Sequence, residues 1–235
     1  MFNFRTGEVL LFDKPLHWTS FQLVNKVKHL IKKHPSLLEN ENRIKPKVGH
    51  AGTLDPLATG LLIVCTGKQT KNINTYQGQE KEYTGTFSIG STTPSFDLET
   101  EVDATFETEH ITEDLLQRTT QQFIGAIEQT PPIYSAIKIN GRRAYDIARE
   151  GGEAEIKSKP IHISAFEITS CNLPEVSFRV VCSKGTYIRS LARDYGLALK
   201  SGAHLTSLRR TRIGEHLVNK AIAISDFEEL LKKEK

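Results

Sequence analysis

The sequence has few of the residues that build metal sites and disulfide frameworks. Its three cysteines, Cys65, Cys171 and Cys182, are odd in number, widely spaced and set in apolar surroundings, and no C-x-x-C pair occurs. None of the eight histidines forms an H-E-x-x-H or H-x3-H pair. These absences argue against a zinc site and a structural disulfide, so we expect buried thiols and no metal.

Long hydrophobic runs are also missing. No segment approaches the roughly 18 apolar residues of a membrane-spanning helix. The N-terminus, MFNFRTGEVLLF, has one basic residue and leads directly into Asp13 and Lys14, which is not the layout of a signal peptide. With 38% apolar and 25% charged residues, the composition is that of a globular protein. We therefore expect a cytoplasmic protein without membrane association.

The net charge is only +3, but the charges are unevenly distributed. Residues 97–114 are rich in Asp and Glu. Residues 184–212 contain one acid, Asp194, against seven cations: Lys184, Arg189, Arg193, Lys200, Arg209, Arg210 and Arg212. This asymmetry is typical of a phosphate-facing surface. A solvated helix face is an equally open interpretation.

The hydrophobic pattern of the first half predicts strands with one long helix between them. A strand over 7–14 stops at Pro15, and apolar residues at helical spacing predict a helix over 20–33 that begins at Thr19 or Ser20. A polar loop covers 35–47. Strands follow at 61–65 and 81–90, and the acidic stretch after them is irregular.

In the second half strands outnumber helices. Helices are predicted at 112–123, with Thr112 as N-cap, at 186–202 and at 225–235, where Ser225 and Glu228 suggest a capping box. An Asn140-Gly141 turn precedes a further helix ending at Gly151, a hairpin joins 163–171 to 175–183, and 204–214 is a strand. The pattern predicts an α+β fold with a large mixed, mostly antiparallel sheet flanked by helices. We expect a single domain over 1–235, with its core at about 7–213.

The segment Gly49-His50-Ala51-Gly52-Thr53-Leu54-Asp55-Pro56-Leu57-Ala58-Thr59-Gly60 contains the strongest candidate for a reactive group. Its three glycines let the backbone turn sharply and approach a ligand closely. Pro56 favours an extended conformation at Asp55, and a carboxylate on a loop before a buried strand is a frequent functional arrangement. On physical grounds alone, a turn former or N-cap is the favoured interpretation of Asp55.

This segment closely resembles the signature around the catalytic aspartate of TruB-type pseudouridine synthases. Five further blocks are similar to that family and follow in its order: DKP at 13–15, KEY at 81–83, IYSAIK at 133–138, the GRRAYDIAREG region, and SKGTYIRSLARD at 183–194. The resemblance extends from about residue 7 to about residue 213.

The resemblance implies a pseudouridine-synthase-type domain with an active-site cleft. The implied reaction isomerises uridine 55 in the TΨC loop of tRNA: the N1–C1′ bond breaks and the base is rejoined through C5, without a cofactor. The uridine has to be flipped out of the folded loop to react. Asp55 matches the essential aspartate, which would attack the sugar or the base or remove the C2′ proton. We expect the protein to act as a monomer on the TΨC arm of tRNA.

The resemblance assigns three more residues to the active site. Tyr83 matches a tyrosine that stacks on the target uracil, and Tyr187 lies in a motif that lines the pocket. Arg189 matches a basic residue that pairs with the catalytic aspartate, which would keep Asp55 ionised and oriented. Without the resemblance, the two tyrosines would be read as core aromatics and Arg189 as a surface helix residue.

Three further residues match the family by position. His50 matches a histidine that helps to displace the target base, although a lone histidine is more often structural. Asp97 occupies a later acidic position of the family, in a segment, STTPSFDLET, that departs from the usual pattern. Lys14 supports the active-site sheet or a phosphate, or forms a salt bridge with Asp13 or another acid.

Many bacterial members of this family carry an additional C-terminal RNA-binding domain of the PUA kind, and we expect this chain to be a short form without it. RNA affinity would then rest on the catalytic domain, with Lys184, Arg209 and Arg210 as phosphate contacts. Three competing functions are weighed. They are a non-catalytic RNA-binding or tRNA-folding protein on the same fold, an rRNA-directed synthase in a guide-RNA complex, and an aspartyl-phosphate enzyme. The last would need a D-x-D-x-T or DKTGT element, and neither occurs.

Overall fold

The computed structural model describes residues 1–39, 42–135, 137–139, 141–150, 152 and 155–234. The chain forms two compact units, Met1–Tyr83 with Arg209–Lys235 and Thr84–Leu208. The chain passes from one unit to the other inside two strands, β6 (Lys81–Ile89) and β14 (Ala203–Ile213), so each of these strands contributes residues to both units. The first unit is therefore discontinuous in sequence.

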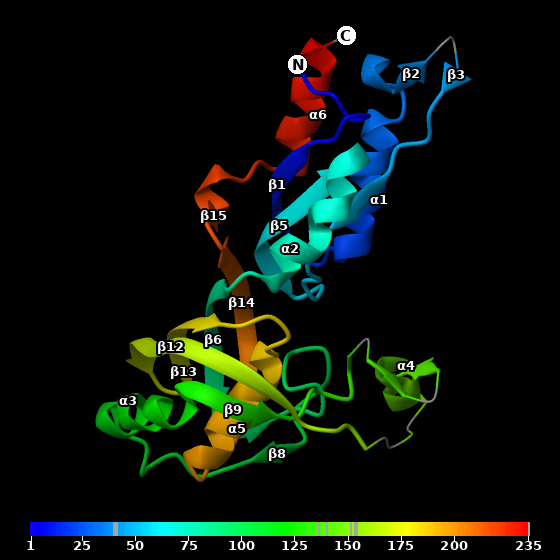
Figure 1. The fold of residues 1–235 in the computed structure, drawn as a ribbon. Coiled ribbons are helices and arrows are strands. Elements are labelled where there is room, and N and C mark those ends of the chain that lie inside the picture. The colour runs from blue at the N-terminus through cyan, green and yellow to red at the C-terminus, as the bar shows by residue number, and fades with distance from the viewer. Residues whose placement is uncertain (40–41, 136, 140, 151, 153–154, 235) are drawn as a thin grey trace. The chain divides into compact units, whose positions relative to one another are not determined.

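Nine strands form one large sheet with hydrogen-bonded order β1-β5-β14-β6-β13-β12-β9, in which β4 and β15 pair with β5 and β14, and three further pairs of short strands form separate two-stranded sheets. The pairs β1–β5, β4–β5, β12–β13, β12–β9 and β14–β15 are antiparallel. Helices pack on strands in both units (Figure 1). This architecture confirms the predicted α+β class with a large, mostly antiparallel sheet.

The first unit is built on β1 (Val9–Lys14), β4 (Val48–His50) and β5 (Ala58–Thr66). Two helices, α1 (Ser20–Ile31) and α6 (Ile224–Lys233), pack on each other, and α6 also packs on β1 (Figure 1). Apolar side chains of these elements and of the segments beside them bury one another: Phe4, Leu10, Phe12, Leu23, Val24, Val27, Ile31, Leu37, Leu62, Val64, Phe227 and Leu231. Burial of this apolar surface is the main favourable contribution to the stability of the unit.

The second unit contains β12 (Lys159–Asn172), β13 (Glu175–Cys182) and β9 (Gly125–Gln129), with α3 (Glu113–Thr120) and α5 (Ile188–Ala198) packed together. Its core is a cluster of aromatic rings. The rings of Phe87 and Phe178 stack at 4.0 Å, and Phe123, Phe166 and Tyr195 pack around them.

The remaining elements are short. They are β2 (Leu38–Glu39), β3 (Asn42–Arg43), α2 (Ile73–Gly78), β7 (Ser91–Thr92), β8 (Ala104–Thr105), β10 (Lys138–Ile139), β11 (Arg142–Arg143), α4 (Ala144–Arg149), β15 (His216–Leu217), and 3-10 turns at Pro35–Leu37, Gly67–Asn72, Gln121–Phe123 and Val218–Lys220. Within the described ranges, no helix combines the length and the apolar character needed to cross a membrane.

The predicted helix starts are mostly confirmed. Thr19 is the N-cap of α1 and forms a capping box with Gln22, and the Thr112 side chain accepts from the Leu115 amide at the start of α3. The capping box predicted at Ser225 is wrong, because the N-cap of α6 lies two residues earlier, at Ala223, whose methyl side chain cannot accept a hydrogen bond.

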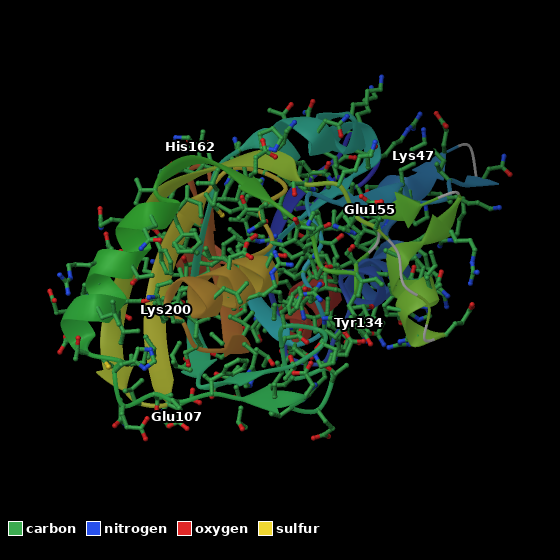
Figure 2. The ribbon with its side chains drawn as sticks, turned by 90° about the horizontal axis from the view of Figure 1, so that it is seen from below. Lys47, Glu107, Tyr134, Glu155, His162 and Lys200 are labelled. Atoms are coloured by element: carbon green, nitrogen blue, oxygen red, sulfur yellow. The ribbon has the colours of Figure 1, made fainter. Side chains whose placement is uncertain are left out.

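Two predicted turns have different outcomes. The hairpin between β12 and β13 is confirmed, with Asn172 paired to Glu175. The predicted Asn140-Gly141 turn lies partly outside the described residues. Glu107, from the acidic stretch, and Lys200, which follows α5, line one open surface cavity of the second unit (both labelled in Figure 2).

Candidate active site

Asp55 lies in the loop that joins β4 to β5. The two strands pair antiparallel, with Gly49 opposite Cys65 and His50 opposite Val64, and the Ala51 amide donates to the Ile63 carbonyl. The residues between them therefore form a closed hairpin loop. Asp55 is half-buried, and its backbone carbonyl accepts a hydrogen bond from the Ala58 amide at 3.1 Å.

The segment between β1 and α1 holds this loop on both sides of Asp55. The Ser20 hydroxyl accepts from the Leu54 amide at 2.8 Å and donates to the Leu54 carbonyl at 3.1 Å. The His17 amide donates to the Pro56 carbonyl at 2.8 Å. Because the residues before and after Asp55 are both bonded to this segment, the backbone that carries the carboxylate is fixed before any ligand arrives.

Arg210 holds the same loop from β14. Its guanidinium donates to three backbone carbonyls, from Nε to Leu61 at 2.8 Å, from Nη2 to Gly52 at 3.1 Å and from Nη1 to Thr53 at 3.4 Å. The side chain is 1% exposed. The expectation that Arg210 contacts a phosphate is therefore wrong. Its guanidinium donates to carbonyls of the protein, and the side chain has almost no exposed surface for contact with RNA.

A glycine allows this close approach of β14. Gly60 has φ of +102°, and a Cβ at this position would lie 2.3 Å from the Arg210 carbonyl oxygen. A side chain is excluded both by the conformation and by the space. The last glycine of the motif is therefore needed for packing of the strand against Arg210.

Lys14 is fully buried at the end of β1, next to the loop. Its ammonium donates to the carbonyls of Pro15 at 2.9 Å and Trp18 at 2.5 Å. Burial lowers the pKa of Lys14 to about 8; the charge of Asp55 opposes this and that of Arg210 adds to it. Lys14 thus supports the segment 15–18. It does not pair with Asp13, whose carboxylate binds Arg209 at 2.6 and 3.0 Å.

His50 and Tyr83 belong to the same unit. Burial lowers the pKa of His50, and a hydrogen bond to the Gly52 backbone partly opposes this. In the described part of the chain, His50 Nδ1 has no hydrogen-bond partner. Tyr83 is buried in β6, in the alternating pattern that also buries Phe87 and Ile89.

In the second unit, the structure brings together two of the predicted residues, Arg189 and Asp97. Both are buried, and Arg189 Nε lies 3.6 Å from Asp97 Oδ2. Arg189 also donates to the Tyr134 carbonyl at 2.9 Å, and the Asp97 carboxylate accepts from the Glu99 amide at 2.9 Å. A buried pair of this kind needs such additional bonds to offset its desolvation. Arg189 is therefore not a surface helix residue. Its predicted pairing with Asp55 stays a prediction.

Tyr187 precedes the first turn of α5 and is tied to β9. Its amide donates to the Gln129 side chain at 2.8 Å, and that side chain donates back to the Tyr187 carbonyl at 3.1 Å. Lys159 Nζ lies 5.0 Å from the centre of the Tyr187 ring, a cation–π contact. The half-buried ring is thus held in place beside a cation.

The basic run 184–212 is largely compensated within the protein. Arg193 pairs with Asp194, and Arg209 and Arg212 pair with Asp13 and Glu80. Lys184 is exposed. The sequence suggests that these cations form one surface. In the structure some are buried, such as Arg210, some pair with acids, and Lys184 is exposed.

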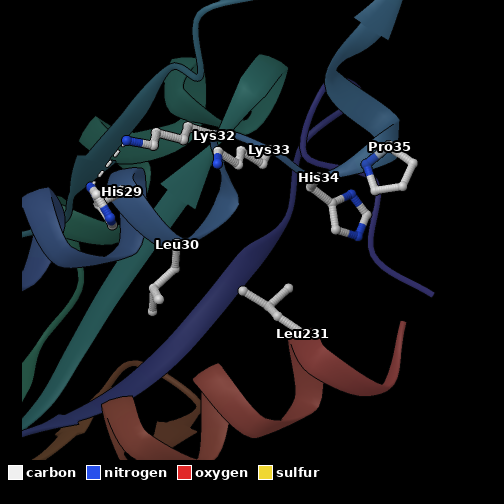
Figure 3. A pocket seen from close by; sticks show the side chains of 7 residues that line it. All are labelled: His29, Leu30, Lys32, Lys33, His34, Pro35 and Leu231. Carbon is white, nitrogen blue, oxygen red and sulfur yellow. Dashed lines mark hydrogen bonds between the residues drawn. The ribbon is translucent and has the colours of Figure 1, made fainter. Parts of the chain in front are cut away.

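A separate cavity of about 340 Å³ lies at the C-terminal end of α1, opposite to the end that holds the loop (Figure 3). Its lining includes Leu30 and Leu231 together with Lys32 and Lys33, and Lys32 Nζ lies 3.4 Å from His29 Nδ1. A 12-residue helix separates its two ends by about 18 Å, so this cavity does not belong to the Asp55 site.

Comparison with known proteins gives consistent matches over the chain. A model of the TruB family pseudouridylate synthase N-terminal domain matches residues 39–188, and one of the tRNA pseudouridylate synthase B C-terminal domain matches residues 189–235. Proteins named tRNA pseudouridine synthase B from Flavobacterium johnsoniae and Phocaeicola vulgatus are 61% and 56% identical, over 96% and 97% of this chain and 96% and 95% of theirs. The crystal structure of a Cbf5-Nop10-Gar1 complex superposes with a TM-score of 0.70 at 29% identity. The match covers 97% of this chain and 55% of the other.

Proposed function

Since this chain belongs to the TruB family of pseudouridylate synthases, we propose that it isomerises uridine 55 in the TΨC loop of tRNA to pseudouridine. The observation that carries the proposal is the placement of Asp55. Its loop is hydrogen-bonded from the 17–20 segment and from Arg210, so the carboxylate is held on a rigid support. Reactive groups need such support, since small displacements of a catalytic group slow the reaction strongly.

Each residue of the site has a role in this proposal. Asp55 reacts with the sugar or the base, or removes the C2′ proton, after the uridine has been flipped out of its loop. Tyr83 and Tyr187 provide rings for the base, and His50 contacts the RNA close to it. Arg189 orients the reacting carboxylate, with Asp97 holding Arg189 in position.

The setting of the reaction is part of the same proposal. The chain acts in the cytoplasm as a monomer and as one catalytic domain over 1–235, without a cofactor. Lys184 and the half-exposed Arg209 contribute phosphate contacts. A tRNA substrate is favoured over guide-directed rRNA because the relatives that match nearly the whole chain are named tRNA pseudouridine synthase B. The match to the structure of the Cbf5-Nop10-Gar1 complex, by contrast, covers only 55% of the other chain.

The test compares the wild-type protein with Asp55→Asn and with Asp226→Asn, the same chemical change at an exposed carboxylate of α6. Unmodified tRNA and a TΨC-arm hairpin are incubated with each, and pseudouridine is mapped with a carbodiimide at single-nucleotide resolution. We expect modification at uridine 55 of both RNAs with the wild type and the control.

Asp55→Asn should bind tRNA within a few-fold of wild type and give no product, since loss of an essential group costs more than about a thousandfold in turnover. Turnover above that level would remove Asp55 from its role. No pseudouridine with the wild-type protein would instead favour a tRNA-folding protein on the same fold. Modification of tRNA alone would show that the TΨC arm is not sufficient.

A further inference from the structure

The segment between β1 and α1, together with the first turn of α1, exposes apolar and ring side chains beside the catalytic loop. Phe21, in the first turn of α1, is 69% exposed, and Leu16 is 48% exposed. His17 lies between them, exposed and with φ of +64°. We call Leu16, His17 and Phe21 the exposed ledge. Exposed apolar side chains that are grouped beside a functional loop mark a binding surface more often than single scattered ones do.

The ledge is attached directly to the site of reaction. His17 donates its amide to Pro56, and Ser20, the neighbour of Phe21, exchanges two hydrogen bonds with Leu54. The left-handed conformation of His17 is unfavourable for a non-glycine residue, and the bond to Pro56 maintains it. The ledge therefore keeps a fixed position relative to Asp55.

The charge of the surrounding chain fits a nucleic acid. From Lys14 to Leu38 there is no Asp or Glu. Of the five lysines in this stretch, Lys14 is buried and Lys26 pairs with Glu228, so the exposed positive charge comes from the remaining three, which lie further along α1. The first turn of α1 contains no acidic residue, so no carboxylate compensates the positive end of the helix beside Phe21. A backbone phosphate is favoured at such a helix end, and an aromatic ring next to it fits the base of the same nucleotide.

We propose that the exposed ledge stacks on an unpaired base of the substrate RNA that adjoins the flipped uridine, with Phe21 as the principal platform. The proposal rests on the proposed function, because it places this base next to the Asp55 loop. Flipping the target uridine out of the RNA loop leaves its neighbour with one face unstacked. The Phe21 ring can cover that face, and stacking on aromatic side chains tolerates any base.

The test combines changes in the protein with changes in the RNA. Affinity for the TΨC-arm hairpin is measured for Phe21→Ala, Phe21→Trp and Leu230→Ala, a control that removes an exposed apolar side chain from α6 of the same unit. Each is measured with the intact hairpin and with a series in which one unpaired loop nucleotide at a time, other than the target, is abasic.

We expect Phe21→Ala to weaken binding of the intact hairpin about tenfold, the range of one base–aromatic stack. At one abasic position, wild type and Phe21→Ala should bind equally. Phe21→Trp should retain wild-type affinity, and Leu230→Ala should change nothing. The single-turnover rate at saturating RNA should stay within about threefold for Phe21→Ala, because Phe21 is not assigned to the chemistry.

Equal affinity of wild type and Phe21→Ala for the intact hairpin would overturn the proposal. So would a loss of affinity that is the same for every abasic RNA, since Phe21 would then act without a base partner. A change of oligomeric state in Phe21→Ala with unchanged RNA binding would assign the ledge to a second copy of the chain. If the wild type forms no pseudouridine, the proposed function fails, whereas the coupling between Phe21 and a base is measured by binding alone.

Discussion

Replacing Lys14 by methionine removes a buried charge from beside the catalytic loop while keeping a side chain of similar length. Lys14 is fully buried, and its pKa is lowered from 10.5 to about 8, mainly by that burial. The folded protein therefore binds the proton less tightly than the unfolded chain. Below pH 8 the fold has to hold a charged ammonium at a cost, and that cost disappears as the pH rises from 8 towards 10.5.

The size of this effect follows from the two pKa values. One pKa unit corresponds to about 1.4 kcal/mol, so a shift from 10.5 to about 8 corresponds to about 3 kcal/mol in total. Of this, about 2 kcal/mol should be gained by the wild type between pH 7 and pH 9.5, where the unfolded chain binds more protons than the fold. Lys14→Met has no such group, so it lacks the gain.

The assay is urea unfolding of both proteins at several pH values from 7 to 9.5. Burial also raises the pKa of Cys65 from 9.0 to about 11. This lowers the stability of both proteins as the pH rises above 9, and it cancels in their difference. The methionine variant should be less stable at every pH because the Pro15 and Trp18 carbonyls lose their donor. A difference between the two proteins that does not change with pH would refute the reasoning.

Two further changes test the packing of the loop. Arg210→Met removes the charged donor of the Gly52, Thr53 and Leu61 carbonyls. At about 1.5 to 3 kcal/mol for a hydrogen bond to a charged group, we expect urea unfolding to show a loss of at least about 3 kcal/mol. The half-exposed Arg209 is the control: Arg209→Met should cost about 1 kcal/mol or less, and equal losses would contradict the anchoring role. Gly60→Ala should destabilise by about 3 kcal/mol or more, because its Cβ would overlap the Arg210 carbonyl. Gly78→Ala, in a helix with open space around it, should be neutral or slightly stabilising in the same assay, and a Gly60→Ala protein as stable as wild type would show that the strands can separate there.

The sequence allowed prediction of those features that depend on local chemistry. The start of α1 at Thr19 and of α3 at Thr112 follow from a side chain that accepts from an amide a few residues on, and the alternation in β6 follows from the period of a strand. The prediction at Ser225 was wrong because a capping motif can occur in the sequence two residues after the true N-cap, inside the first turn of the helix.

Features that depend on the pairing of distant strands could not be predicted. Arg210 and its neighbour Arg209 look alike in a basic run. In the structure, however, Arg210 is buried and donates to backbone carbonyls at the Asp55 loop, whereas Arg209 binds Asp13. Successive strand residues point to opposite faces, but the sequence does not say which face meets the Asp55 loop. The pairing of Arg189 with Asp97 was missed for the same reason, since more than 90 residues separate the two.

Because the first unit is discontinuous in sequence, the Asp55 loop and the residue that anchors it are synthesised at different times. Residues 84–208 are inserted between the two sequence segments that form it. On the ribosome, the Asp55 loop and β5 emerge early, while Arg210 follows only after the whole second unit has been made. Until then the carbonyls of Gly52, Thr53 and Leu61 lack the donor that fixes them. The whole second unit of a nascent chain is therefore synthesised before the reactive loop is set.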